Sequence, residues 1–146
     1  MPPPLWQIWV ETGGTFTDCL ALSPDGRQSH AKLLSSGRLR GVVSATDGAT
    51  VTLTGGVVSG AGLLAGCLLR PLAPDGGFAT ILRDEPADQG VLLTLDRPLA
   101  LTPGCAAEID FREDAPVVAA RLVTRTPRTS HLPPSAMRLA TTRGTN

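Results

Sequence analysis

The chain has 146 residues, of which 42% are hydrophobic, so it is long enough to form one domain, or a small domain with an insertion, around a buried core. Aromatic residues make up only 3% and tyrosine is absent, so Val, Leu and Ala must supply most of that core. Thirteen basic residues balance thirteen acidic ones, and this net charge of zero gives no electrostatic footprint for nucleic acid or for an anionic membrane.

The cysteine spacing and the amino-terminal residues indicate the compartment. Cys19, Cys67 and Cys105 are odd in number and far apart, which predicts buried free thiols rather than a zinc site or a disulfide framework. Residues 1–4 have neither a basic start nor a following apolar run, so no signal peptide is predicted. The apolar stretch at 57–69 is too short and too rich in glycine to span a bilayer. We therefore expect a cytoplasmic protein that binds neither nucleic acid nor membranes.

Residues 7–20 predict two strands joined by a tight turn. Trp9 and Val10 before the turn, and Phe16 and Cys19 after it, suit a pleated, half-buried surface. Glycine allows the main chain to turn and to approach a ligand closely, and consecutive backbone N–H groups then form an anion cradle. Carboxylates beside such a cradle can hold the water shell of Mg²⁺. The same residues are equally typical of an ordinary Gly-Gly hairpin turn.

The candidate phosphate-binding residues surround this turn. They supply backbone N–H donors and hydroxyl groups for phosphate, and a pair of carboxylates that can bind the water molecules on Mg²⁺. In chain order they are Glu11, Gly13, Gly14, Thr15, Thr17 and Asp18. The carboxylates of Glu11 and Asp18 form the predicted magnesium site, and no catalytic residue is assigned.

After the turn the chain continues as an antiparallel meander up to a boundary near residue 36. Residues 23–26 (Ser-Pro-Asp-Gly) predict a turn, and residues 28–34 predict a third strand. From 37 to 112 short β-type runs alternate with turns that contain glycine, which predicts a small antiparallel sheet or barrel. The candidate strands in this region are residues 42–43, 51–53, 67–69, 78–81, 91–95 and 107–111.

The last segment, residues 113–146, predicts a helix and one more strand. Glu113 to Pro116 has the composition of a helix start, and the helix is expected to end near Thr124. Residues 138–141 predict a strand parallel to the first and beside it, and ligands gather at the carboxyl ends of such strands in α/β sheets. The candidate substrate or phosphate contacts at that end are Thr141, Thr142, Arg143 and Thr145. A strand-to-helix turn with a cap residue accounts for the same residues equally well.

Residues 11–17 (Glu-Thr-Gly-Gly-Thr-Phe-Thr) resemble the first phosphate motif of the actin-like ATPases, a superfamily that covers sugar kinases, heat-shock chaperones and actin. The longer string Gly-Gly-Thr-Phe-Thr-Asp at 13–18 is similar to the opening of the hydantoinase/5-oxoprolinase family. That family has Asp where this chain has Glu11, whose extra methylene moves the carboxylate relative to the turn. Further segments that match the family in order lie within residues 32–35, 113–122 and 132–146.

The resemblance implies an α+β or α/β fold class, in the form of a partial actin-like (ribonuclease H-like) ATPase core with an inserted antiparallel β module. Residues 1–36 would be a β-meander with the phosphate loop, and residues 37–112 would be the inserted module. Residues 113–146 would be the helix and a further strand of a truncated core. Actin-like ATPases also need a second phosphate loop and an adenosine-binding segment from later in the chain, and no second Asp-x-Gly-Gly-like turn with matching hydroxyls is found after Asp18. The chain is therefore expected to be an amino-terminal domain that is not competent alone.

The resemblance also implies the reaction of an ATP-dependent cyclic-amide hydrolase of the 5-oxoprolinase or hydantoinase type, with ATP and Mg²⁺ as cofactors. ATP would phosphorylate the lactam oxygen, and water would then attack the activated ring carbon. The expected partners are the remainder of the same enzyme or a partner subunit, and a small cyclic-amide substrate. An alternative is a non-catalytic binding or assembly module, or a subunit piece of the related ATP-dependent ketone carboxylases. The identity of the ring, and the choice between hydrolysis and carboxylation, stay open.

Overall fold

The computed structural model describes residues 4–55, 62–73 and 76–141. Of the described residues, 52% lie in strands and 8% lie in a single helix. The chain divides into two compact units. The first unit comprises Met1–Gly37, Glu113–Thr126 and Ser130–Asn146, and the second comprises Arg38–Arg112 and Pro127–Thr129.

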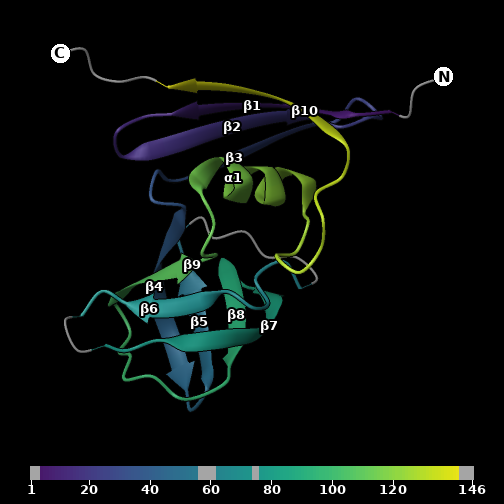
Figure 1. Cartoon of the computed structure of the whole chain (residues 1–146). Helices are drawn as coiled ribbons and strands as arrows, with labels where there is room; N and C mark the ends of the chain where they lie inside the picture. Colours follow the sequence, from purple (N-terminus) through teal and green to yellow (C-terminus); the bar gives the residue numbers. More distant parts are fainter. Residues whose placement is uncertain (1–3, 56–61, 74–75, 142–146) are drawn as a thin grey trace. The chain divides into compact units, whose positions relative to one another are not determined.

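The first unit contains a four-stranded sheet in the order β10-β1-β2-β3 (Figure 1). Strands β1 to β3 form the antiparallel meander that the sequence predicts, and β10 pairs with β1 in parallel on the other side, also as predicted. Alternate side chains of the three meander strands are buried, because one face of the sheet is covered. The four strands are β1 (Trp6–Thr12), β2 (Phe16–Leu22), β3 (Gln28–Leu34) and β10 (Ser135–Thr141).

Helix α1 (Ala115–Thr124) covers that face and buries its apolar side against β1, β2 and β3 (Figure 1). Asp114 is extended at the N-cap but makes no side-chain cap hydrogen bond. Pro116, whose φ is fixed near the helical value, therefore favours the start of the helix. Arg125 ends the helix in the left-handed conformation. Among the described residues, no helix combines the length and the hydrophobicity needed to cross a membrane.

An ion pair at the buried side of the helix ties three segments of the first unit together. The guanidinium of Arg121 donates to both carboxylate oxygens of Glu113, at 2.7 and 3.1 Å, and to the backbone oxygen of Ser130 at 2.8 Å. The Arg121 side chain is only 9% exposed, so this charge is neutralised by a partner of fixed geometry. The residues before the helix and the residues that lead back to β10 are thereby held to α1.

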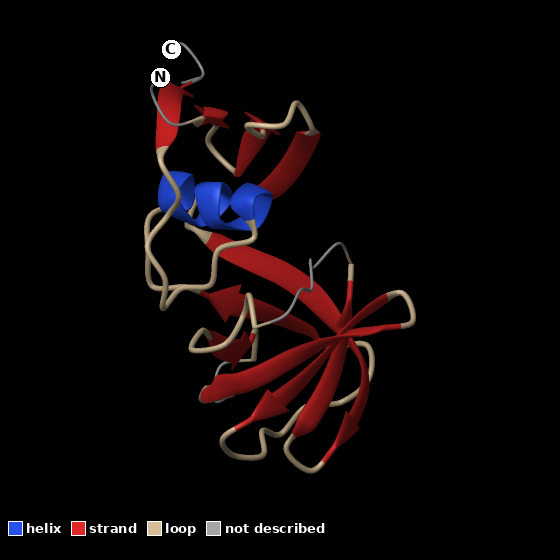
Figure 2. Ribbon diagram, turned by 90° about the vertical axis from the view of Figure 1, so that its right-hand side faces the viewer, coloured by secondary structure: helices blue, strands red, loops and turns tan. Residues whose placement is uncertain are grey.

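The second unit is a closed antiparallel barrel in the order β4-β5-β8-β7-β6-β9, which Figure 2 shows as strands curving round one another. Its interior is filled by branched side chains, among them Val43, Leu53, Ile81, Leu93 and Ile109, each at most 1% exposed. Closure leaves no strand edge open. The strands are β4 (Arg38–Asp47), β5 (Thr50–Thr54), β6 (Leu68–Pro71), β7 (Ala79–Ala87), β8 (Gly90–Leu95) and β9 (Ala106–Asp110).

The predicted fold class is wrong: the protein is mostly β and does not have an α/β actin-like (ribonuclease H-like) ATPase core. A layered α/β fold covers both faces of its sheet with helices, whereas the described part of this chain has one helix on one face. The prediction rested on the motif of a single hairpin. The long middle segment has a period of two instead, and it forms a separate barrel.

Two of the four crossings between the units, after Gly37 and before Glu113, lie side by side in the first unit. Gly37 has a φ of +87°, and a Cβ on it would lie 2.5 Å from the backbone oxygen of Glu113. A residue with a side chain is therefore excluded at position 37 both by its backbone conformation and by its neighbour. The chain leaves the first unit after Gly37 and returns to it at Glu113. The sequence analysis placed these breaks after residues 36 and 112.

Replacing Gly37 with alanine should destabilise the first unit by about 1–3 kcal/mol, because the new Cβ meets a backbone oxygen and the φ is strained. Both tryptophans of the chain, Trp6 and Trp9, lie in β1, so their fluorescence during urea unfolding reports this unit. The matched control is Gly14→Ala, where nothing lies within 4 Å of the added Cβ. Equal unfolding midpoints for the two variants would contradict the role given to Gly37.

Candidate functional site

The turn between β1 and β2 is closed by one backbone hydrogen bond and is otherwise exposed. The N–H of Gly13 donates to the oxygen of Phe16 at 2.9 Å. Gly13 and Gly14 are absent from the residues with positive φ, so the turn does not use the conformational freedom of glycine. A Cβ on Gly14 would meet no atom within 4 Å. The local fold therefore does not require glycine at position 14, and the missing side chain leaves the backbone there open to close approach by an outside group.

Ser35, just after the end of β3, holds this turn from one side. Its N–H donates to the oxygen of Thr15 at 2.8 Å, and its hydroxyl donates to the oxygen of Gly13 at 2.7 Å. The same hydroxyl lies 2.9 Å from the hydroxyl of Thr17, whose residue is 0% exposed. Pairing of β2 with β3 brings Ser35 there, because Phe16 lies opposite Leu34 in the register.

Two carbonyls of the turn are therefore occupied, while two of its N–H groups are left open. The carbonyls of Gly13 and Thr15 are both occupied by Ser35. In the part of the chain that the structure describes, the N–H groups of Gly14 and Thr15 form no hydrogen bond, and both residues are exposed. Exposed backbone donors without partners are the feature that makes a turn attract an anion.

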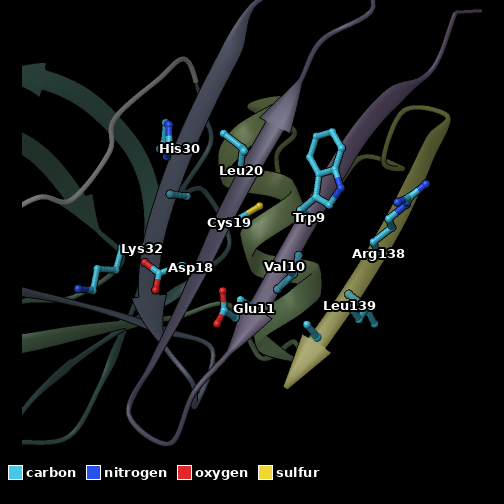
Figure 3. Close-up of a pocket in the computed structure, with 12 residues that line it drawn as sticks. Trp9, Val10, Glu11, Asp18, Cys19, Leu20, His30, Lys32, Arg138 and Leu139 are labelled. Carbon is cyan, nitrogen blue, oxygen red and sulfur yellow. The ribbon is translucent and has the colours of Figure 1, made fainter. Parts of the chain in front are cut away.

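Two carboxylates face each other beside the turn, on the side of the sheet away from α1. Glu11 of β1 lies directly opposite Asp18 of β2, and both are exposed. Figure 3 shows both carboxylates in front of the sheet, with the helix behind it. Like charges placed directly opposite on paired strands are destabilising. A hydrated Mg²⁺ between them would relieve that repulsion, since Mg²⁺ keeps several water ligands and needs few carboxylates.

The side chain of Lys32, on the third strand, continues the row formed by Glu11 and Asp18. Lys32 lies opposite Asp18 in the register of β2 and β3, and its Nζ is 4.7 Å from the centre of the Phe16 ring. Over the described ranges, no group of three or more His, Cys, Asp or Glu side chains is assembled as a metal site. A divalent cation here would have Glu11 and Asp18 as its carboxylate partners and water as most of its ligands.

The open face of the sheet is hollowed over the same strands, with a cavity volume of about 810 Å³ (Figure 3). A second row of paired side chains crosses the sheet two residues further from the turn. It consists of Arg138, Trp9, Leu20 and His30. The hollow thus has an apolar floor of Trp9 and Leu20 beside the charged row that contains Glu11. Its volume is in the range of small-molecule sites.

The structure brings most of the predicted site residues together but separates one of them. Gly13, Gly14 and Thr15 form the turn, and Glu11 and Asp18 lie beside it on the open face. Thr17 points to the opposite, buried side, where its hydroxyl is engaged by Ser35 and is not presented to the exterior.

The predicted substrate contacts lie mostly outside the described residues. Thr141 is exposed at the end of β10, opposite Thr12 of β1, and so it lies at the same end of the sheet as the turn. Thr142, Arg143 and Thr145 fall outside the described ranges.

Sequence reasoning did not assign Ser35 or Trp9 to the site. The sequence signal for Ser35 was its position directly after the predicted third strand. In an antiparallel meander, the end of the third strand lies beside the turn between the first two. For Trp9 the signal was strand alternation, which places it on the same face as Glu11.

Cys19 is not a nucleophile of this site. It is 3% exposed beneath α1, and desolvation by burial raises the pKa of its thiol to about 11. A thiol needs to be exposed and ionised to attack a substrate, and Cys19 is neither. Its role is to pack as a small apolar residue between the sheet and the helix.

No protein-family model matches this chain, and neither a curated protein nor a solved structure matches it. The assignment of function therefore depends on the geometry of the first unit and on the resemblance of its motifs.

In the folded protein at pH 8, Cys19 should resist alkylation while the half-buried Cys105 reacts first. A pKa of about 11 in place of 9.0 lowers the thiolate fraction roughly 100-fold, and burial slows access further. Timed iodoacetamide labelling, followed by mass spectrometry of the cysteine peptides, measures the three rates separately. Urea-unfolded protein is the control, in which all three should react alike. Equal rates for Cys19 and Cys105 in the folded state would place Cys19 at the surface.

Proposed function

We propose that the first unit binds the phosphates of Mg²⁺·ATP at the β1–β2 turn and serves in the ATP-dependent opening of a cyclic amide. The observation that carries this proposal is the polarity of the turn. The carbonyls of Gly13 and Thr15 are occupied by Ser35, while the donors of Gly14 and Thr15 are free and exposed. An arrangement of this kind favours an anion over a cation or a neutral group.

The residues beside the turn fit the remaining charges of such a ligand. Glu11 and Asp18 would accept hydrogen bonds from water molecules on Mg²⁺, and Lys32 would lie at the far end of the same row. ATP supplies the phosphoryl group, which passes to the lactam oxygen and activates the ring carbon toward water. Phosphoryl transfer requires mainly positioning and charge neutralisation from the protein, and these residues provide both.

The hollow on the open face would receive the substrate ring. Its floor of Trp9 and Leu20 is apolar, which suits the carbon atoms of a small ring, and the charged row lies directly beside it. The ring would then lie next to the bound phosphates, as an in-line transfer to the lactam oxygen requires. The choice between 5-oxoproline and a hydantoin is left to substrate assays.

The proposed reaction needs more than the described residues supply. A second set of phosphate contacts and an adenosine site would come from the remainder of the same enzyme or from a partner subunit. The site would hold only one side of the nucleotide, because among the described residues of the first unit only α1 packs on the sheet, and it covers the opposite face. We place this function in the cytosol, where ATP is supplied and free thiols stay reduced.

A second candidate function is that of an assembly module, and it is favoured by the surface of the barrel. Val42, Leu72, Phe78 and Leu82 are between 42% and 58% exposed there. Exposed apolar side chains on an otherwise closed barrel suit contact with another protein. The module would then present the barrel to a subunit of an ATP-dependent hydrolase or ketone carboxylase.

Titration with tripolyphosphate and Mg²⁺ should shift the backbone amide signals of Gly14 and Thr15 more than any others. These are the free donors of the turn, so an anion must contact them first. Proton–nitrogen correlation spectra of the ¹⁵N-labelled chain measure the shifts residue by residue. The matched control is Gly48, a glycine in the exposed hairpin turn between β4 and β5, whose amide should stay in place. Unchanged Gly14 and Thr15 signals at saturating tripolyphosphate would remove the phosphate function and favour the assembly module.

Glu11→Gln and Asp18→Asn should each weaken binding of Mg²⁺·tripolyphosphate by up to about fivefold, since exposed charge interactions are worth about 0.2–1 kcal/mol. The same variants should bind metal-free tripolyphosphate more tightly, because a repelling carboxylate has been removed. Isothermal titration with and without Mg²⁺ measures both effects. Asp88→Asn, an exposed carboxylate change in the barrel, is the control. Weaker binding in both conditions would contradict a role for these carboxylates in holding the metal.

A further inference from the structure

A directed chain of hydroxyl groups runs beneath the turn. The hydroxyl of Ser35 has one hydrogen, and its 2.7 Å contact with the carbonyl of Gly13 uses it, because a carbonyl can only accept. The 2.9 Å contact between the hydroxyls of Ser35 and Thr17 must then be donated by Thr17. The order of donation is therefore Thr17 to Ser35 to Gly13.

The burial of Thr17 makes this direction stable. The residue is 0% exposed, so its hydroxyl has no access to water and would lose a hydrogen bond if Ser35 turned away. The free energy lost by leaving a buried donor unpaired exceeds the net gain from one ordinary hydrogen bond. Ser35 is thus held in the rotamer that donates to Gly13.

The bond to Gly13 also fixes the direction of a donor in the turn. The carbonyl of Gly13 and the N–H of Gly14 belong to one peptide group, which is planar and trans, so the two point in opposite directions. Drawing the carbonyl toward Ser35 sends the N–H of Gly14 to the opposite side, away from Ser35. A peptide between two glycines is the easiest kind to rotate, because neither neighbour has a side chain that resists it.

We propose that Ser35 and Thr17 are positioning residues, which lock the Gly13–Gly14 peptide with its N–H turned toward the bound phosphate. This inference rests on the proposed phosphate function. If the lock is lost, the peptide rotates and presents its carbonyl to the ligand, which repels an anion. Thr17 therefore contributes to binding from beneath the turn without touching the phosphate.

The test measures the affinity for Mg²⁺·tripolyphosphate in four variants of the whole chain. Ser35→Ala removes the bond to Gly13 but keeps the backbone N–H that holds Thr15, and Thr17→Val removes only the donor because valine has nearly the same shape. We expect both variants to bind about five- to tenfold more weakly, the factor that one lost hydrogen bond corresponds to. Ser35→Thr keeps the hydroxyl and should restore the affinity. Ser135→Ala is the matched control, because it removes a 2.7 Å serine-to-carbonyl bond to Pro133 in the same unit, at the start of β10.

Two further readouts separate positioning from a general loss of structure. Tryptophan fluorescence gives the unfolding free energy of the first unit, and hydrogen exchange gives the protection of the Gly14 amide. We expect weaker binding and altered Gly14 exchange in Ser35→Ala at concentrations of urea where the unit stays folded. Affinity equal to that of the unaltered chain in both Ser35→Ala and Thr17→Val would overturn the inference. So would a loss that Ser35→Thr fails to restore, or one that Ser135→Ala shares.

The outcomes also distinguish this inference from the function on which it rests. If the unaltered chain shows no tripolyphosphate binding, the phosphate function fails and the positioning role fails with it. If the unaltered chain binds and the variants bind equally well, only the positioning role fails.

Discussion

The site depends on the return of the third strand to the first turn. Antiparallel pairing of β2 with β3 places Ser35 against the β1–β2 turn, and its hydrogen bonds to Gly13 and Thr15 occupy the carbonyls of that turn. Without this contact, the turn would be a Gly-rich loop whose donors and acceptors are equally exposed. With this contact, two carbonyls are occupied beside two exposed N–H groups, and such an arrangement favours an anion.

The turn and the neighbouring carboxylates have opposite electrostatic preferences. Together they favour a ligand that carries both a negative and a positive charge. The turn attracts negative charge, while Glu11 and Asp18, a few ångströms along the same strands, repel it. A phosphate group alone would satisfy the turn and conflict with the carboxylates. A phosphate that arrived with a hydrated divalent cation would satisfy both, so in the proposed function the carboxylates would favour the metal-bound form of the ligand.

The local elements could be predicted from the sequence, but the fold class could not. Alternating apolar residues around Gly13 predicted the hairpin, and residues 138–141 predicted a strand beside the first, which the pairing of Trp9 with Arg138 confirms. The actin-like core was wrong because one hairpin motif was extended to a whole architecture. How many helices cover a sheet is decided by segments far from that motif.

Hydrogen bonds at the site were the hardest feature to predict. Thr17 was expected to bind phosphate because it is a hydroxyl residue near the turn, yet strand alternation turns it toward the buried face with Cys19. That Ser35 meets Thr17 there depends on the register between two strands. Register becomes definite only when the buried face packs against α1.

The close approach of Gly37 to Glu113 joins the two ends of the longest excursion that the chain makes out of the first unit. Within the first unit, the residue at which the chain leaves, Gly37, lies against the residue at which it returns, Glu113. A short bridge across this point would be enough to close the smaller unit on itself. A chain in which residues 38–112 are shortened or exchanged can therefore keep the β1–β2 turn, Ser35 and α1, because all three belong to the first unit.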